Sequence, residues 1–150
     1  MSNVGLAQAS LIVDKALEHG RHLKLKPLTV AVLDAGGHLV ALKREDNSSL
    51  LRPQIACGKA WGVLGMGFGG RELARRAAAA PAFVSALTAA SEGRIIPVPG
   101  GVLIRNDAAT ITGAVGISGD LSEQDEACAG AGIKAAGLVP DTGEPGCRLT

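Results

Sequence analysis

Lys59 is the residue with the clearest chemical potential in this sequence. It lies on one side of a predicted helix whose other members there are apolar or small: Ile55, Gly62, Val63 and Met66. A buried lysine is unfavourable unless it is paired, and burial lowers its pKa. Lys59 could therefore form an internal ion pair with Asp34 or Glu126, or it could hold a carboxylate or donate a proton as a catalytic residue. The sequence leaves both interpretations open.

A second group of candidates lies in and after the glycine-rich stretch 97–119. Gly100 and Gly101 form a bend, and their N–H groups could also bind an anion. Ser118, Gly119 and Asp120 precede a predicted helix, whose free N–H groups and positive dipole end favour an anion. Glu126, in the first turns of that helix, could act as a general acid or base.

Two arginines and two histidines complete the candidate site residues. Arg44 and Arg52 flank a polar loop; each is either a solvated surface residue or a bidentate partner for a carboxylate. His19 ends the first predicted helix, where it would favour the helix dipole or ligate a metal. His38 follows a glycine turn and is either a turn residue or a metal ligand at a loop rim.

Composition excludes several classes of function. The net charge is +1 with mixed signs, only 2% of residues are aromatic and tyrosine is absent, so neither nucleic-acid binding nor membrane binding is indicated. The three cysteines have no metal-ligand spacing, which favours reduced thiols. The first residues lack the layout of a signal peptide, and we expect a cytoplasmic protein. No P-loop, dinucleotide fingerprint or nucleophile elbow occurs.

Periodicity predicts the elements that must position these residues. Helices are expected at 6–19, from Ser48 or Ser49 to about 65, and at 71–80, 82–90 and 122–136, the last capped by Ser122 with Asp125 in a capping-box position. Strands are expected at 28–33, 38–44, 95–96, 102–105 and 110–117. Helices segregated from antiparallel hairpins indicate an α+β fold.

The hairpin 102–117 organises the predicted site. Ile111, Gly113, Val115 and Ile117 share one face of its second strand, and Thr112, Ala114 and Gly116 share the other. Glycines inside a strand usually mark close approach by a helix, another backbone or a ligand. We therefore expect a hollow for a negatively charged ligand near this hairpin. Residues 1–138 are expected to form one domain, and 139–150, with two prolines, a loose tail.

Four blocks together resemble the GlcG/HbpS family, which includes the C-terminal domain of PduO: VAVLDAGGHLVALKRED, IACGKAWG, PVPGGVLIRN and GAVGISGDLSEQDEACAGAGI. The similarity spans about residues 5–138. The resemblance implies a profilin-like fold with a five-stranded antiparallel sheet flanked by helices. It also implies homo-oligomers of dimer size or larger. Characterised members bind haem, iron or corrinoid-linked partners, and some relatives are lyases on aromatic acids.

Two functions follow from these observations. The first is a binding protein for haem, a similar tetrapyrrole or iron, in a cleft at loops and an oligomer interface. Basic residues would hold the propionates, and His19, His38 or no histidine would ligate the metal. The second is a cofactor-free, lyase-like enzyme acting on a small carboxylated or aromatic molecule. In that case Lys59 and an arginine would hold the carboxylate, Glu126 would move protons, and the amides of 118–120 would stabilise negative charge.

Overall fold

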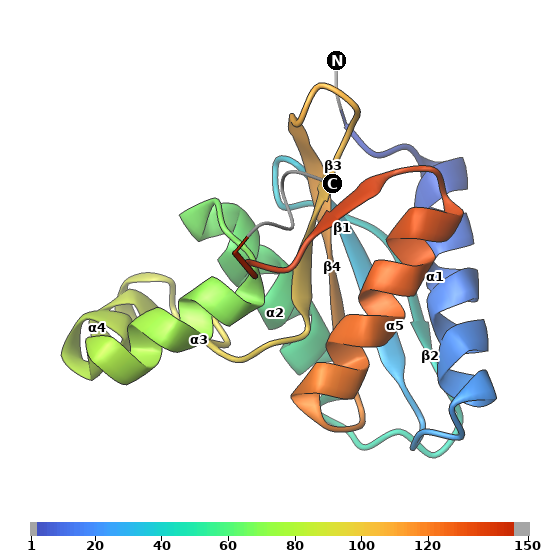
Figure 1. Cartoon of the computed structure of the whole chain (residues 1–150). Coiled ribbons are helices and arrows are strands. Elements are labelled where there is room, and N and C mark those ends of the chain that lie inside the picture. The colour runs from blue at the N-terminus through green and yellow to red at the C-terminus, as the bar shows by residue number, and fades with distance from the viewer. Residues whose placement is uncertain (1–2, 146–150) are drawn as a thin grey trace.

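The computed structural model describes residues 3–145 and shows one antiparallel sheet with helices on both faces (Figure 1). The strands are β1 (Thr29–Asp34), β2 (Leu39–Arg44), β3 (Gly101–Arg105), β4 (Ile111–Ser118) and β5 (Val139–Asp141), in the spatial order β2-β1-β4-β3-β5. The helices are α1 (Leu6–His22), α2 (Arg52–Met66), α3 (Gly70–Ala79), α4 (Pro81–Ala90) and α5 (Ser122–Ala135). The predicted α+β class with five antiparallel strands is confirmed.

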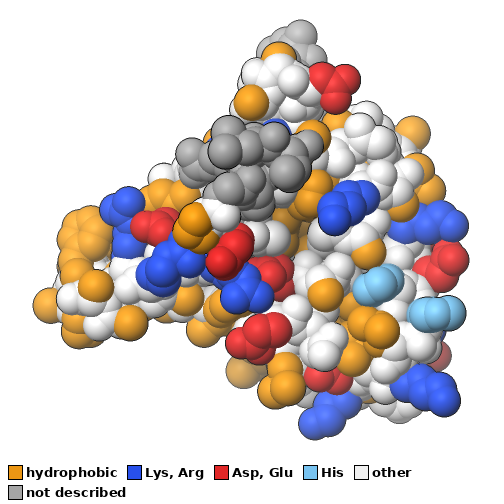
Figure 2. All heavy atoms as spheres, viewed as in Figure 1, with side chains coloured by type: hydrophobic (Ala, Val, Ile, Leu, Met, Phe, Trp, Pro, Cys, Tyr) orange, Lys and Arg blue, Asp and Glu red, His pale blue; other side chains and the backbone are white. Residues whose placement is uncertain are grey.

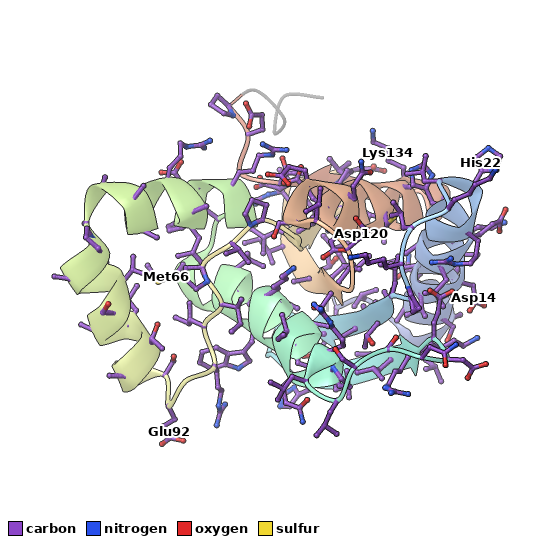
Figure 3. All side chains as sticks on the ribbon, turned by 90° about the horizontal axis from the view of Figure 1, so that it is seen from below. Asp14, His22, Met66, Glu92, Asp120 and Lys134 are labelled. Atoms are coloured by element: carbon purple, nitrogen blue, oxygen red, sulfur yellow. The ribbon has the colours of Figure 1, made fainter. Side chains whose placement is uncertain are left out.

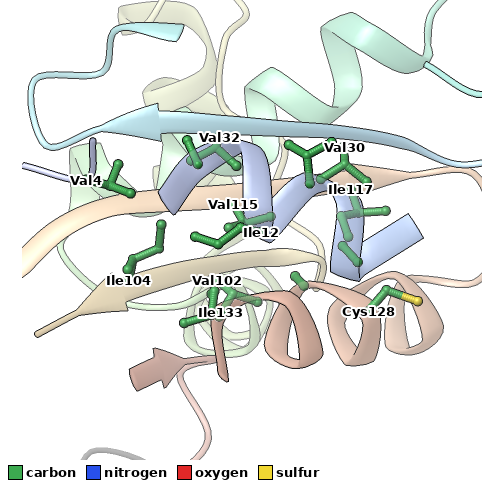
Figure 4. Packing of buried hydrophobic residues seen from close by; sticks show 14 of the residues in the cluster. Val4, Ile12, Val30, Val32, Val102, Ile104, Val115, Ile117, Cys128 and Ile133 are labelled. Carbon is green, nitrogen blue, oxygen red and sulfur yellow. The ribbon is translucent and has the colours of Figure 1, made fainter. Parts of the chain in front are cut away.

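Helices α1 and α5 cover one face of the sheet and pack against each other. The core between them and the strands is apolar throughout (Figure 4), with members from every layer: Ile12, Val13, Val30, Val32, Val102, Ile104, Val115, Ile117, Cys128 and Ile133. Gly132 permits the close helix contact, because a Cβ there would lie 2.6 Å from the carbonyl oxygen of Ile12 in α1. This face supplies most of the buried apolar area, which is the main stabilising term in folding.

Helix α2 covers the opposite face, over β1, β4 and β3. Its small residues let it lie close to the sheet, and Gly116 of β4 sits so near that an added Cβ would collide with the carbonyl oxygen of Ala56. The alternation predicted for β4 is confirmed from Ala114 to Ile117: Val115 and Ile117 face α1 and α5, whereas Ala114 packs with Ala60 and Val63 of α2. It is wrong for Ile111, which packs with the α2-side cluster because the pairing of β3 with β4 shifts register there. The predicted close approach at the strand glycines is that of a helix at Gly116, and that of β1 and Val4 at Gly113.

Helices α3 and α4 extend away from the sheet as a paired arm (Figure 1). Charged side chains of both signs gather on the surface around α3 (Figure 2), which carries three arginines and one glutamate; Glu72 pairs with Arg75 and Arg76. Helix α4 carries no charged residue and buries only Val84. Among the helices of residues 3–145, none combines the length and the apolar character that crossing a bilayer requires.

Four expectations for local structure were wrong. Residues 139–141 of the predicted loose tail form β5, because β3 offers them a free edge and Arg105 pairs with Asp141 at 2.9 Å; residues 146–150 lie outside the described part. Residues 95–96 form no strand. Ser122 does not cap α5 and neither Ser48 nor Ser49 caps α2: the N-cap residues are Leu121 and Leu51, without side-chain cap bonds.

Candidate functional site

Lys59 lies at the centre of the predicted site and is buried, with 4% of its side chain exposed. Its Nζ donates to the carbonyl oxygen of Ile117 at 2.9 Å and lies 3.3 Å from Oδ2 of Asp125, which is 1% exposed. Of the two interpretations of the sequence, the structure therefore favours an internal ion pair. The partner is Asp125, and not Asp34 or Glu126.

The environment moves both members of this pair towards neutrality. Burial lowers the pKa of Lys59; attraction to Asp125 opposes that shift, and the nearby charge of Arg52 adds to it. Burial raises the pKa of Asp125, against the pull of Lys59 and a hydrogen bond from the N–H of Asp120. Such a pair is costly to break, because removing one partner leaves the other charge buried and unpaired.

Gly100 and Gly101 lie directly on Lys59. A Cβ on Gly100, whose φ is +114°, would lie 2.8 Å from Nζ of Lys59, and a Cβ on Gly101 would collide with the Lys59 carbonyl oxygen. The glycine-rich entry to β3 therefore accommodates α2 and its lysine. The space that the sequence predicted for an anionic ligand is occupied here by the Lys59 side chain itself.

Arg52 and Ser118, both predicted to bind ligand, are in direct contact. Nη1 of Arg52 donates to Oγ of Ser118 at 3.0 Å, and Nε donates to Oγ of Ser49 at 3.0 Å. The contact joins the start of α2 to the end of β4.

Gly119 and Asp120 form the turn between β4 and α5 (Figure 3). A Cβ on Gly119 would collide with the carbonyl oxygen of Pro27. The Asp120 carboxylate accepts hydrogen bonds from the backbone N–H of Lys26 and of Leu121, which lower its pKa. The N–H of Asp120 donates to Asp125. The amides of Asp120 and Leu121 are thus already bound within the protein.

Glu126 is not in contact with Lys59. It lies on a different side of α5 from Asp125 and forms an ion pair with Nε of Arg71 in α3, at 2.9 Å. Burial raises the pKa of the Glu126 carboxyl, and Arg71 opposes that shift. The two predicted catalytic residues therefore have separate partners.

The two predicted metal ligands lie far apart in the fold. His19 is half-buried in the last turn of α1. His38 follows the β1–β2 turn, has an 81% exposed side chain, and its Nδ1 lies 3.1 Å from Oδ1 of Asp34. Burial would raise the pKa of Asp34, but hydrogen bonds from His38 and Gly36 outweigh it and lower that pKa. Within residues 3–145, no three potential metal ligands cluster.

A cavity of about 370 Å³, here called the α2 cavity, is lined by Gly37 and Leu39, the two chain neighbours of His38, but not by His38 itself. It is bounded by α2, the β1–β2 turn and the loop after α4, and its lining is mainly apolar: Leu33, Gly37, Leu39, Gln54, Cys57, Gly58, Trp61, Gly93 and Arg94. The Arg94 guanidinium lies over the Trp61 ring, 5.1 Å from its centre. Burial raises the pKa of the Cys57 thiol, so this thiol is protonated at neutral pH.

Sequence reasoning missed Trp61, Cys57 and Arg94 as lining residues. One signal was available for two of them: the only tryptophan of the chain stands one helical turn after Cys57, within the IACGKAWG block. Arg94 gave no such signal, because its position over Trp61 depends on how the arm returns to the sheet.

A second cavity, of about 450 Å³, lies between α1 and the end of β2. Its lining is mixed in charge: Leu17, Arg21, Pro27, Lys43, Arg44, Glu45 and Asp46. Arg21 pairs with Glu45 at 3.0 Å and Lys43 with Asp14 at 2.7 Å, so these charges are largely satisfied internally. Arg44, a predicted ligand-binding residue, donates to the carbonyl oxygen of Ser48.

The fold and the α2 cavity define a small α+β domain with a ligand-sized space against one face of its sheet. The model of the family described as haem degrading protein HbpS-like matches residues 4–134, and the chain therefore belongs to the HbpS-like family. The resemblance seen in the sequence is confirmed. No curated protein sequence matches the chain.

Solved structures agree with this assignment. A PduOC:heme complex is 25% identical, with a TM-score of 0.81, over 91% of this chain and 96% of that one. Klebsiella pneumoniae protein ORFY is 23% identical, with a TM-score of 0.83, over 91% and 92% of the two chains. A double mutant of Streptomyces reticuli HbpS is 24% identical, with a TM-score of 0.76, over 89% and 87%. The last two show the shared fold.

Proposed function

We propose that this protein binds haem, or a similar flat tetrapyrrole with carboxylate groups, in the α2 cavity. Membership of the HbpS-like family and similarity to a PduOC:heme complex support this class of ligand. The observation that carries the proposal is the composition of the cavity: apolar walls, a tryptophan and one arginine. His38 lies outside the lining, between Gly37 and Leu39, on the solvent side where a second copy of the chain would complete the site.

The residues present fit a haem. Leu33, Leu39 and Trp61 provide apolar and aromatic surface for a flat ring. Arg94 would bind a propionate, because its guanidinium fork matches carboxylate geometry. The cavity is smaller than a whole haem and Leu39 at its edge is 55% exposed. The remainder of the ring would therefore be covered by a second copy of the chain, consistent with the predicted homo-oligomer.

His38 would ligate the iron. Its Nδ1 is bonded to the Asp34 carboxylate, which fixes the tautomer with the proton on Nδ1 and leaves the Nε2 lone pair free. Haem is favoured over a free iron ion, because the described residues offer no group of three ligands whereas a porphyrin supplies four nitrogens of its own. When bound, haem would supply redox chemistry; the chain supplies apolar enclosure, the charge of Arg94 and one nitrogen ligand.

The cytoplasmic location is also a proposal. Cys57 and Cys128 are free thiols, as expected in a reducing compartment. The alternative function, a cofactor-free lyase, required Lys59 and Glu126 to act on one substrate. Because they are engaged by Asp125 and Arg71 respectively, geometry favours the binding function.

The test is titration of the purified full chain with hemin, followed by the Soret band. We expect saturable binding, a changed Soret position in His38→Ala, and weaker binding in Arg94→Gln by about tenfold. His19→Ala is the matched control, since His19 lies in α1, on the other face of the sheet from the α2 cavity, and should behave as wild type. A spectrum altered by His19→Ala and not by His38→Ala would move the site to α1. Absence of saturable binding would refute the proposal.

A further inference from the structure

A ring of polar residues, separate from the α2 cavity, surrounds one end of the sheet beneath the start of α2. Register places Thr29 of β1 directly between Arg44 of β2 and Ser118 of β4, so the three side chains share the α2 face. Arg44 bonds to Ser48, and Arg52 bridges Ser49 to Ser118. The strand register and these hydrogen bonds link six residues in a ring, here called the hydroxyl ring: Thr29, Arg44, Ser48, Ser49, Arg52 and Ser118.

Two hydroxyl groups of this ring have no partner. Oγ1 of Thr29 and Oγ of Ser48 are buried and make no hydrogen bond, in residues that are 0% and 7% exposed. A buried hydroxyl left without a partner destabilises the fold, and such groups in native proteins usually mark a bound water or ion. Ser48 accepts a hydrogen bond from Arg44 through its carbonyl oxygen, and Thr29 pairs with Arg44 across the two strands. The two hydroxyls without a partner therefore lie in the same polar region.

The charge around the ring is positive. Arg44 and Arg52 belong to it, and the ammonium of Lys59 is close enough for Arg52 to influence its titration. The N-terminus of α2, which is the positive end of its dipole, begins at Arg52 and adds to this positive charge. Carboxylates close to the ring in the chain or the fold are already engaged: Glu45 by Arg21 and by the N–H of Leu28, Asp125 by Lys59 and by the N–H of Asp120, and Asp120 by the N–H groups of Lys26 and Leu121. Positive charge together with unused hydroxyl donors is the environment that an oxyanion requires.

We propose that the hydroxyl ring is a binding site for a small oxyanion, a phosphate or a carboxylate group, held by the hydroxyls of Thr29 and Ser48 and by the guanidinium groups of Arg44 and Arg52. The anion enters on the surface side, where it replaces the contacts of Arg52 with Ser118 and of Arg44 with Ser48. Leu50 and Leu51, which are exposed immediately before Arg52, would contact the apolar part of a larger ligand.

Inorganic phosphate and acetate, titrated into the full chain at constant ionic strength and followed by backbone amide NMR shifts, test this site. Saturable shifts at residues 29, 48 and 52 are expected from phosphate, acetate or both. Phosphate alone would define a phosphate site, acetate alone a carboxylate site, and both a general oxyanion site. No saturable shift with either ion would overturn the proposal.

Variants separate binding from a structural role. Thr29→Val removes the hydroxyl at nearly constant shape, and Arg52→Gln removes the charge; each should weaken anion binding by about tenfold or more. Arg75→Gln, at an exposed arginine of α3, is the charge-matched control and should bind as wild type. Thr29→Val should fold at least as stably as wild type without anion, because it deletes an unsatisfied donor; if it does not fold, Ser48→Ala carries the same test. Unchanged affinity in these ring variants would assign the hydroxyls to water and refute the site.

Discussion

The two faces of the sheet differ in the polarity of the side chains buried against them. The face under α1 and α5 is apolar without interruption, whereas the face under α2 carries buried Thr29, Lys59, Thr112 and Ser118, several glycines and the α2 cavity at its edge. One face supplies enough apolar burial for the fold, and the other can therefore carry polar groups that cost stability. Binding residues are thus expected on the α2 face.

Lys59→Met tests the polar interior of the α2 face and should have the largest effect. It leaves Asp125 buried without its cation, which should lower the free energy of unfolding by about 3–5 kcal/mol in urea titrations. The double variant Lys59→Met with Asp125→Asn should recover most of the loss, because no charge then remains buried. A single variant as stable as wild type would show that the pair is not held as described.

Gly116→Ala tests how closely α2 approaches the sheet. The added methyl group would collide with the Ala56 carbonyl, so α2 must shift, at a cost of about 3 kcal/mol in the free energy of unfolding. Gly65→Ala is the matched control within α2, since the nearest atom, in Trp61, lies 3.9 Å away. It should stabilise the protein by up to about 1 kcal/mol. Equal effects of the two substitutions would contradict the close packing.

Cys128 tests the apolar face through pH. Burial, with nearby acids adding to it, raises the pKa of this thiol from 9.0 to about 11. Because the folded state keeps the proton longer, this contribution to stability is complete below pH 9 and is lost as pH rises towards 11. The loss should be about 1–3 kcal/mol. Urea unfolding between these pH values should show a shallower decline in Cys128→Ala than in wild type.

Cys57 provides the smallest effect on stability and the sharpest contrast with Cys128. Cys57→Ala should change the free energy of unfolding by less than about 1 kcal/mol, because the thiol lines a cavity and not the core. In a Cys147→Ser background, a maleimide should label Cys57 and leave Cys128 unmodified. Hemin should slow the labelling of Cys57 in proportion to saturation. Labelling that hemin does not affect would place the ligand outside the α2 cavity.

Local patterns predicted much of this fold. The alternation from Ala114 to Ile117 of β4 and the small residues of α2 gave the correct faces, because burial on a regular strand follows a period of two. Ile111 lies past a register shift, which a period of two cannot anticipate. Helix caps were predicted poorly. Ser122, Ser48 and Ser49 have the residue type that favours N-caps, but the caps are Leu121 and Leu51. Nearby Asp125 and Arg52 instead bind Lys59 and Ser118, in other elements. Strand β5 could not be predicted, since three residues carry no periodicity and only the free edge of β3 makes them a strand.

The site was less predictable than the fold. The sequence indicated that Lys59 lies on an apolar side of its helix and therefore needs a partner. It also singled out Arg52 and Ser118, which form a hydrogen bond with each other. It did not show that Asp125 would be the partner of Lys59, nor that Trp61, Cys57 and Arg94 would line one cavity with the β1–β2 turn. Lys59 and Asp125 are 66 positions apart and Trp61 and Arg94 are 33 apart, and no spacing within a helix or strand encodes such contacts.

The sequence by itself determined the class of the fold, the faces of its strands and the family, because these depend on local periodicity and on ordered blocks of residues. Only the tertiary structure decided which charged side chains pair within the protein and which remain available to a ligand. That distinction depends on distances between elements and on burial, and both arise only when α2, α5 and the arm have packed against the same sheet.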